Sequence, residues 1–127
     1  MYELPEEDLE FLNGNFNDKW ERVAEGNKRG LIIHSYGLPQ GYTPNEVNLM
    51  LLIPTDYPAG QLDMFYFSPG VSREGGIAIG GLSFETHFGT QWQRWSRHYT
   101  WRPGEDNIVT HVSYVRNELK SELQKAM

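Results

Sequence analysis

The stretch Ile53-Pro54-Thr55-Asp56-Tyr57-Pro58 opens a segment, IPTDYPAGQLDMFYFSPG (residues 53–70), on which the fold depends. The apolar run Leu62–Phe67 follows this turn, and Ser68-Pro69-Gly70 closes the segment. Each proline fixes its own φ, removes an amide donor and restricts the residue before it. We therefore expect residues 53–58, here called the Tyr-Pro corner, to be a rigid connection between two strands of a sheet.

Apolar stretches on both sides of the corner predict a sheet. Four short strands in an antiparallel meander are expected at Trp20–Ala24, Gly30–Tyr36, Val47–Ile53 and Leu62–Phe67. Pro5 and the acidic residues after it predict a short helix over residues 4–12, with Gly14 as its stop.

A long helix is expected at the C-terminal end, after a cap at Asp106. Its apolar stripe consists of Ile108, Val112, Val115, Leu119 and Leu123. Between sheet and helix, the glycine-rich residues 71–81 and the polar-aromatic residues 84–101 predict irregular structure. The pattern is typical of a single α+β domain over residues 1–127, whose C-terminal helix packs on the sheet.

Composition restricts the function. Seventeen acidic residues against eleven basic ones give a net charge of −6, which argues against a nucleic-acid or membrane-surface binder. The chain contains no cysteine, so disulfides, thiolate metal sites and thiol nucleophiles are excluded. No apolar run approaches the roughly 20 residues of a membrane span, and we expect a cytoplasmic protein without a cofactor.

The order of motifs resembles the ubiquitin-conjugating (E2, or UBC-like) fold. Residues 53–58 are similar to the family's F/I-P-x-x-Y-P, and Ser68-Pro69-Gly70 stands where the family has His-Pro-Asn. Gly75-Gly76-Ile77-Ala78-Ile79 resembles the active-site segment Gly-x-Ile-Cys-Leu, and Trp101-Arg102-Pro103 resembles the Trp-x-Pro before a helix. Ala78 lies eight residues past Gly70, which is the usual separation of the family's asparagine and cysteine.

Nearly the whole chain resembles a narrower bacterial group, prokaryotic E2 family E. The shared features include Leu38-Pro39-Gln40-Gly41-Tyr42, the Tyr-Pro corner and the run Trp92-Gln93-Arg94-Trp95-Ser96-Arg97-His98. The resemblance implies partners of the kinds associated with that group, which are ubiquitin-like proteins, E1-like adenylating enzymes and isopeptidase-like proteins. Residues 79–100 form an insertion relative to an ordinary E2.

The departures from the family decide the chemistry. Ala78 stands at the cysteine position and cannot attack a carbonyl group, and Gly70 lacks the side-chain amide of the family's asparagine. Loss of an oxyanion donor costs about 10²–10³ in rate, whereas loss of the nucleophile removes the covalent step altogether. Transfer through a cysteine thioester is therefore excluded.

Another residue could carry an acyl group as an oxyester, given a hydroxyl beside a histidine base. Ser83 lies near His87 in sequence, with Glu85 available to orient the ring, and Ser96 with His98 forms a second cluster. All of these side chains could equally be ordinary polar residues of loops without a catalytic role. Their spacing matches no strong zinc pattern, so no metal site is expected.

A basic-aromatic cluster is the candidate partner-binding surface. It contains Trp92, Trp95, Arg97, His98 and Trp101. Tryptophan and arginine are enriched at binding hot spots, although Trp92 and Trp95 at i, i+3 would also suit a helical face that closes the core.

Three hypotheses follow from these residues. The first is an E2-like component that binds a ubiquitin-like protein non-covalently and works with an E1-like enzyme. The second is a transferase that uses a serine or threonine oxyester with a histidine base. The third is a structural subunit that self-assembles through the aromatic cluster.

Overall fold

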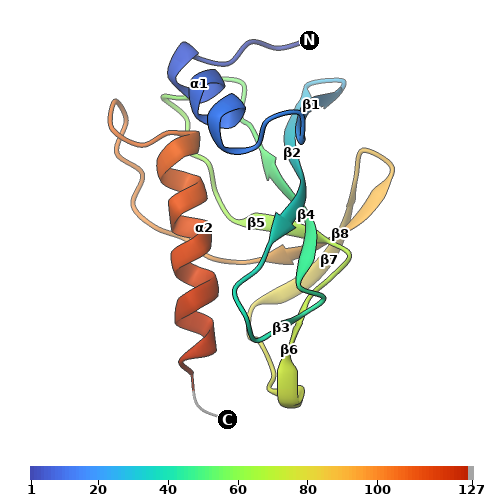
Figure 1. Cartoon of the computed structure of the whole chain (residues 1–127). Coiled ribbons are helices and arrows are strands. Elements are labelled where there is room, and N and C mark those ends of the chain that lie inside the picture. Colours follow the sequence, from blue (N-terminus) through green and yellow to red (C-terminus); the bar gives the residue numbers. More distant parts are fainter. Residues whose placement is uncertain (126–127) are drawn as a thin grey trace.

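Six antiparallel strands form one sheet in the computed structural model, which describes residues 1–125 (Figure 1). The strands are β1 (Trp20–Glu25), β2 (Lys28–Gly37), β4 (Glu46–Leu52), β5 (Phe65–Ser68), β7 (Leu82–His87) and β8 (Thr90–Trp95), in the order β1-β2-β4-β5-β8-β7. A separate pair joins β3 (Tyr42–Thr43) to β6 (Ser72–Arg73), and the 3-10 helix η1 (Glu74–Gly76) follows. The predicted α+β class is confirmed.

The expected four-stranded sheet is wrong in its strand number. Strands β1, β2, β4 and β5 form the predicted meander, but β8 pairs with β5 and β7 pairs with β8. Much of the section expected to be irregular is thus a hairpin. Its two-residue turn, Phe88-Gly89, has positive φ at both positions (54° and 76°), as a primed hairpin turn requires.

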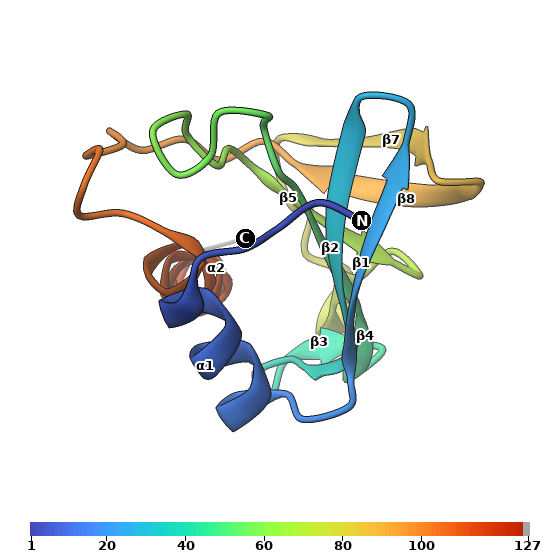
Figure 2. The ribbon, with the colours of Figure 1, turned by 90° about the horizontal axis from the view of Figure 1, so that it is seen from above.

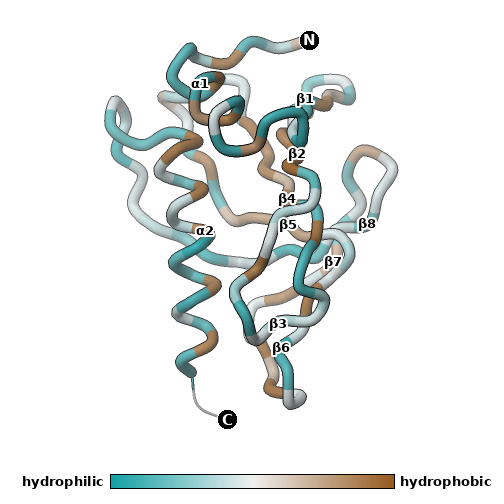
Figure 3. Tube along the Cα trace, viewed as in Figure 1, coloured by the Kyte–Doolittle hydropathy of each residue, from teal (hydrophilic) through white to brown (hydrophobic). Residues whose placement is uncertain are grey.

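Helices α1 (Glu6–Asn15) and α2 (Ile108–Leu123) cover one face of the sheet. Ile108, Val112, Val115 and Leu119 are buried, as the stripe predicts, and Figure 3 shows hydrophobic residues repeating along α2. The expected cap and stop were wrong by one residue: Asn107 caps α2 in a capping box with Thr110, and α1 continues through Gly14. Neither helix within residues 1–125 has the length and apolarity to cross a membrane.

The start of β5 also differs from expectation, because residues 62–64 are not part of the strand. Met64 has a positive φ of 59°, which breaks the extended conformation just before Phe65. Leu62 is nevertheless buried in the main core. The apolar run therefore correctly predicted that Leu62 is buried, but it wrongly predicted an extended strand at residues 62–64.

The two faces of the sheet carry separate cores. The main core lies between the sheet and the helices and includes Leu31, Leu49, Phe65, Phe67 and Trp95. A smaller cluster on the outer face consists of Ile32, Met50, Tyr66 and Trp92, with Val23, Leu52 and Phe88 packed against it. Strand residues alternate between these cores, as the period of two requires.

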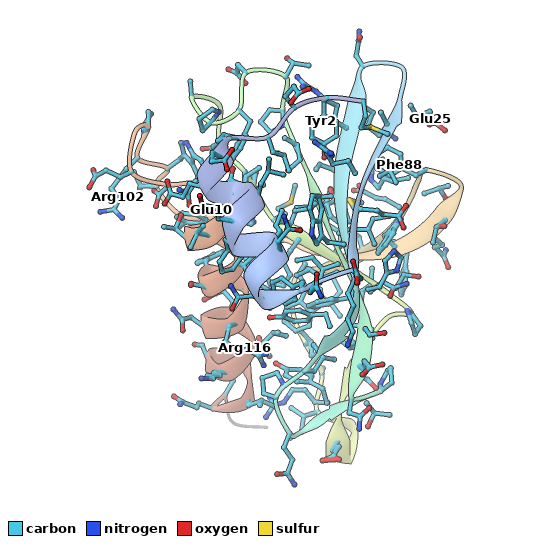
Figure 4. The ribbon with its side chains drawn as sticks, turned by 45° about the horizontal axis from the view of Figure 1, so that its top comes forward. Tyr2, Glu10, Glu25, Phe88, Arg102 and Arg116 are labelled. Carbon is cyan, nitrogen blue, oxygen red and sulfur yellow. The ribbon has the colours of Figure 1, made fainter. Side chains whose placement is uncertain are left out.

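The sheet twists so strongly that its two end hairpins meet on the outer face. Figure 2 shows β7 and β8 running across the direction of β1 and β2. The ring of Phe88, at the tip of the β7–β8 hairpin, lies beside β2 (Figure 4) and would stand 2.6 Å from a Cβ at Gly30. Glycine is required there because any side chain would displace this ring.

Tyr57 of the Tyr-Pro corner joins both helices. Its hydroxyl donates to Asp8 Oδ2 of α1 at 2.5 Å and accepts from the Ile108 amide at the start of α2 at 2.7 Å. Burial raises the pKa of the Tyr57 hydroxyl, and it raises the pKa of the Asp8 carboxyl group as well. Trp101 Nε1 donates to the Pro58 carbonyl at 3.1 Å, so the corner is held from two sides.

We predict that Tyr57→Phe lowers the free energy of unfolding by about 1–3 kcal/mol, because the buried Asp8 carboxylate and the Ile108 amide both lose a partner. Urea unfolding followed by tryptophan fluorescence measures the change. Tyr114→Phe is the matched control: its hydroxyl donates to the His98 carbonyl at an exposed position, so a change below about 0.5 kcal/mol is expected. Equal stabilities of the two variants would contradict the role of Tyr57.

Candidate functional site

The loop that carries Ala78 lies between η1 and β7 and borders an apolar groove. Ala78 is exposed, and the groove has a volume of about 410 Å³. Its lining residues are Val71, Ser72, Arg73, Gly76, Ile77, Ala78, Ile79 and Leu82. The position that resembles the family's cysteine is thus accessible and surrounded by aliphatic side chains, and its methyl group offers no nucleophile.

Val71, which follows Gly70, is held by a buried glutamine of β8. Gln93 Nε2 donates to the Val71 carbonyl at 3.1 Å, and Gln93 Oε1 accepts from the Val71 amide at 2.9 Å. Trp95 Nε1 donates to the same oxygen at 3.1 Å. A Cβ at Gly70 would lie 3.2 Å from Gln93 Nε2, so the Gln93 amide lies close to where a side chain at position 70 would begin.

The Ala78 loop is anchored to the last turn of α2 by Arg97. The Arg97 guanidinium donates to the Gly80 carbonyl at 3.1 Å and to Glu122 Oε1 at 3.1 Å, and it stacks over the Trp95 ring. Glu122 is only 3% exposed and also faces Arg73 at 3.9 Å. Two arginines and the more exposed Lys125, at 3.1 Å, therefore compensate one buried carboxylate. The carbonyl contacts of the two arginines fix both the loop and the helix end.

Arg73 completes this anchor. Its guanidinium donates to the carbonyl groups of Leu123 and Lys125, which satisfies acceptors that the end of a helix leaves free. Tyr42 supports the same turn, because its hydroxyl donates to the Leu119 carbonyl at 2.6 Å. The wall of the groove formed by β6 is consequently tied directly to α2.

The predicted partner-binding residues do not form one surface. Trp92 and Trp95 lie on a strand rather than a helix and point to opposite faces; they are 2% and 0% exposed, so neither can contact a docked partner. The side chain of Arg97 is largely buried against Glu122. Only His98 is well exposed, beside Asp63 at 2.8 Å, and Trp101 is half-buried against Tyr57.

The predicted acyl-transfer residues do not form a hydrogen-bonded pair: within residues 1–125, no hydrogen bond joins Ser83 or Ser96 to His87 or His98, and His98 Nδ1 pairs with Asp63. His87 Nε2 lies 2.8 Å from Glu85 Oε1, as expected for an oriented ring, but its Nδ1 lies 3.0 Å from Lys28 Nζ. Both ring nitrogens are thus occupied by groups other than a hydroxyl. Ser83 Oγ is buried without a hydrogen-bond partner in the described structure, and Ser96 makes its backbone hydrogen bond to Gly81.

The Glu85 carboxylate is the centre of a polar cluster on the outer face. It accepts from Arg94 Nη1 and from the Tyr66 hydroxyl at 3.4 Å, in addition to its contact with His87. The hydrogen bond to His87 is the main cause that lowers the pKa of Glu85. Burial raises the pKa of Tyr66 to about 12, so its hydroxyl stays protonated and can donate.

A second buried histidine supports the loop before α2. His111 Nε2 donates to the Met64 carbonyl at 2.9 Å, and its Nδ1 lies 2.9 Å from the Tyr99 hydroxyl, which can donate to it. Burial lowers the pKa of His111, so the neutral ring is the favoured form. Within residues 1–125, no group of three or more histidine, aspartate and glutamate side chains is arranged to hold a metal ion.

Comparison with known proteins identifies the family. Prokaryotic E2 family E matches residues 4–122, which is most of the chain. The protein belongs to prokaryotic E2 family E. The comparisons with curated proteins and with solved structures each found no match.

Several residues that support the Ala78 groove and the Glu85 cluster could not be predicted from the sequence. Lys28, Arg73, Gln93 and Glu122 come from distant parts of the chain and act through tertiary contacts that local spacing does not reveal. The one available signal was the alternation along residues 82–87, where Ser83, Glu85 and His87 share a strand face. That pattern would have placed Glu85 beside His87 on an outer surface.

We predict that Glu122→Gln lowers the free energy of unfolding by about 3 kcal/mol, because it removes the buried carboxylate that faces both Arg73 and Arg97. Guanidinium unfolding measures the effect. Glu118→Gln is the control, since Glu118 is a more exposed partner of Arg97 at 3.6 Å and its loss is expected to cost less than about 1 kcal/mol. A Glu122→Gln variant as stable as Glu118→Gln would refute the anchor.

We predict that acid destabilises the fold through His111. Its folded-state pKa lies below the unfolded value, so its contribution is complete above about pH 6.5 and is lost as pH falls, by at most about 1.4 kcal/mol per pH unit. The measurement compares unfolding of the wild type and of His111→Gln from pH 7.5 to 5. The contributions of the other titratable groups to the pH dependence cancel when the unfolding free energies of the two proteins are subtracted. Identical pH slopes would rule out this role for His111.

Proposed function

We propose that this protein is a cysteine-less E2-like component of a bacterial ubiquitin-like protein modification system. It binds a ubiquitin-like protein non-covalently in the cytoplasm and works with an E1-like enzyme. Membership of prokaryotic E2 family E supports the system. The single observation that supports non-covalent binding is that Ala78 is exposed beside an anchored groove. The groove offers aliphatic side chains to a partner, and Ala78 offers no nucleophile.

The architecture is consistent with this proposal. The helix α1, the β1-β2-β4-β5 meander, the Tyr-Pro corner and α2 follow the element order of an E2-like domain, which would span residues 1–127. The β7–β8 hairpin is then an addition to that domain. It extends the sheet at the side of β5 and forms one wall of the groove through Leu82.

The groove suits an extended peptide tail. Ile77, Ile79 and Leu82 present partly exposed aliphatic surface, and β7 is an edge strand of the sheet. Among residues 1–125, no strand pairs with its outer side. Extended peptides bind at such edges through main-chain hydrogen bonds, while pockets select alternate side chains. The C-terminal tail of a ubiquitin-like protein has the required form.

The two alternative functions have less support. An oxyester mechanism needs a hydroxyl within reach of a histidine base, and both nitrogens of His87 face other groups. Self-assembly through the aromatic cluster needs exposed rings, and both Trp92 and Trp95 are buried. Binding in the groove beside Ala78 requires neither a hydroxyl beside a histidine nor an exposed tryptophan ring.

We predict that Ala78→Arg weakens binding of the cognate ubiquitin-like protein by at least about tenfold, equivalent to 1.4 kcal/mol, because a long charged side chain would fill an apolar groove. Isothermal titration calorimetry measures the affinity. Asn117→Arg adds the same charge at an exposed position of α2 and should bind as the wild type does. No binding by the wild type, or equal binding by Ala78→Arg, would reject the proposal.

A further inference from the structure

Lys28, His87 and Glu85 lie in line on the outer face of the sheet, away from the Ala78 groove. Lys28 Nζ stands 3.0 Å from His87 Nδ1, and His87 Nε2 stands 2.8 Å from Glu85 Oε1. The lysine comes from the start of β2 and the other two residues from β7, so tertiary folding assembles the row. The twist that brings the two end hairpins together places these groups in contact.

The hydrogen-bond roles in this row follow from the chemistry of the groups. A lysine ammonium group only donates, so Nδ1 of His87 accepts from it, and Nε2–H then donates to the Glu85 carboxylate. Arg94 and Tyr66 hold the carboxylate from its other sides. Carboxylate, imidazole and nucleophile stand in the same order in acyl-transfer sites, where the nucleophile is usually a hydroxyl or thiol.

The surroundings of Lys28 provide access for a reactant. Lys28 and Tyr66 both line a surface groove of about 270 Å³, which also contacts the Tyr-Pro corner at Pro54. The His87 side chain is only 12% exposed, and the Phe88 ring lies 5.6 Å from Lys28 Nζ on another side. Lys28 thus lines an open groove, while the imidazole that it contacts is largely shielded from solvent.

We propose that Lys28 is an activated amine that accepts an acyl group from an activated carboxylic ester, with His87 as its general base. Glu85 is a positioning residue that fixes the ring and stabilises the imidazolium. The proposal holds for any activated ester. Only the identity of the natural donor, the activated C-terminal carboxyl group of a ubiquitin-like protein, rests on the proposed function.

The step balances without an oxidant or reductant. The Lys28 ammonium passes one proton to His87 Nδ1, and the Nζ lone pair attacks the carbonyl carbon of an acyl adenylate or thioester. This attack forms the C–N bond and gives a tetrahedral intermediate, and the C–O or C–S bond to the leaving group breaks as that intermediate collapses. His87 gives its proton to the leaving group, and the nitrogen loses a second proton to water. The product is an amide on Lys28.

The experiment compares the lysines within the wild-type protein. The chain is treated with limiting N-hydroxysuccinimide acetate, and peptide mass spectrometry follows acetylation at Lys19, Lys28, Lys120 and Lys125. Lys28 is expected to react about tenfold faster than Lys19 and Lys120, although those two are exposed and Lys28 is half-buried. A rate at Lys28 equal to theirs, or below it, overturns the proposal.

Variants of the row test whether His87 is a general base for Lys28 or only a structural contact. His87→Gln should reduce the rate at Lys28 to that of Lys120, because a glutamine side chain cannot take up the proton. Glu85→Gln should slow Lys28 by less than His87→Gln does, because it leaves the base in place and removes only the group that positions it. His34→Gln is the matched control, because it breaks another histidine–glutamate pair, to Glu21 at 2.6 Å, and should leave Lys28 unchanged. If the folded His87→Gln variant acetylates Lys28 at the wild-type rate, His87 is not the general base and the proposal is rejected.

The two proposals fail independently. Circular dichroism establishes that each variant is folded, and if His87→Gln is not, the comparison of lysines in the wild type decides the matter alone. Acetylation requires no ubiquitin-like partner. A wild type that shows selective Lys28 acetylation and no binding in the calorimeter would therefore retain the amine site and reject the proposed function.

Discussion

The hydroxyl group of Tyr57 is the contact on which the arrangement of the helices depends. It connects the corner between β4 and β5 to the buried carboxylate of Asp8 in α1 and to the first amide of α2. Burial makes each of these groups costly to leave without a partner. The corner and the two helices consequently hold one another in position.

The far end of α2 is fixed by charge rather than by a neutral hydrogen bond. Glu122 lies between Arg73 and Arg97, and these arginines also reach carbonyl groups of α2 and of the Ala78 loop. A pair buried in this way contributes modest net stability, but it permits few alternative geometries. Helix α2 is thus fixed at both ends, and its length sets the distance between the Tyr-Pro corner and the Ala78 loop.

The sequence predicts the parts of this structure that depend on local pattern. The apolar stripe predicted α2, the apolar runs predicted the β1-β2-β4-β5 meander, and the prolines predicted the corner between β4 and β5. Periodicity could not give the partner of β5, because strand pairing depends on the chain path and not on the residues of one strand. The same limit applies to Trp95, whose burial follows from pairing of β8 with β5, and to Glu122, a charged residue buried by arginines distant in sequence.

Strand β7 links the two faces of the molecule through the alternation of its side chains. Leu82 faces the groove and Phe84 lies beside Gly70, while Glu85 and His87 point to the outer face. A shift of the register by one residue would exchange these sets, placing charge in the groove and apolar groups beside Lys28. The two-residue turn at Phe88-Gly89 prevents such a shift, because it fixes the pairing of His87 with Thr90. The hairpin is therefore an ordered part of both surfaces, and its turn geometry sets which chemistry each face presents.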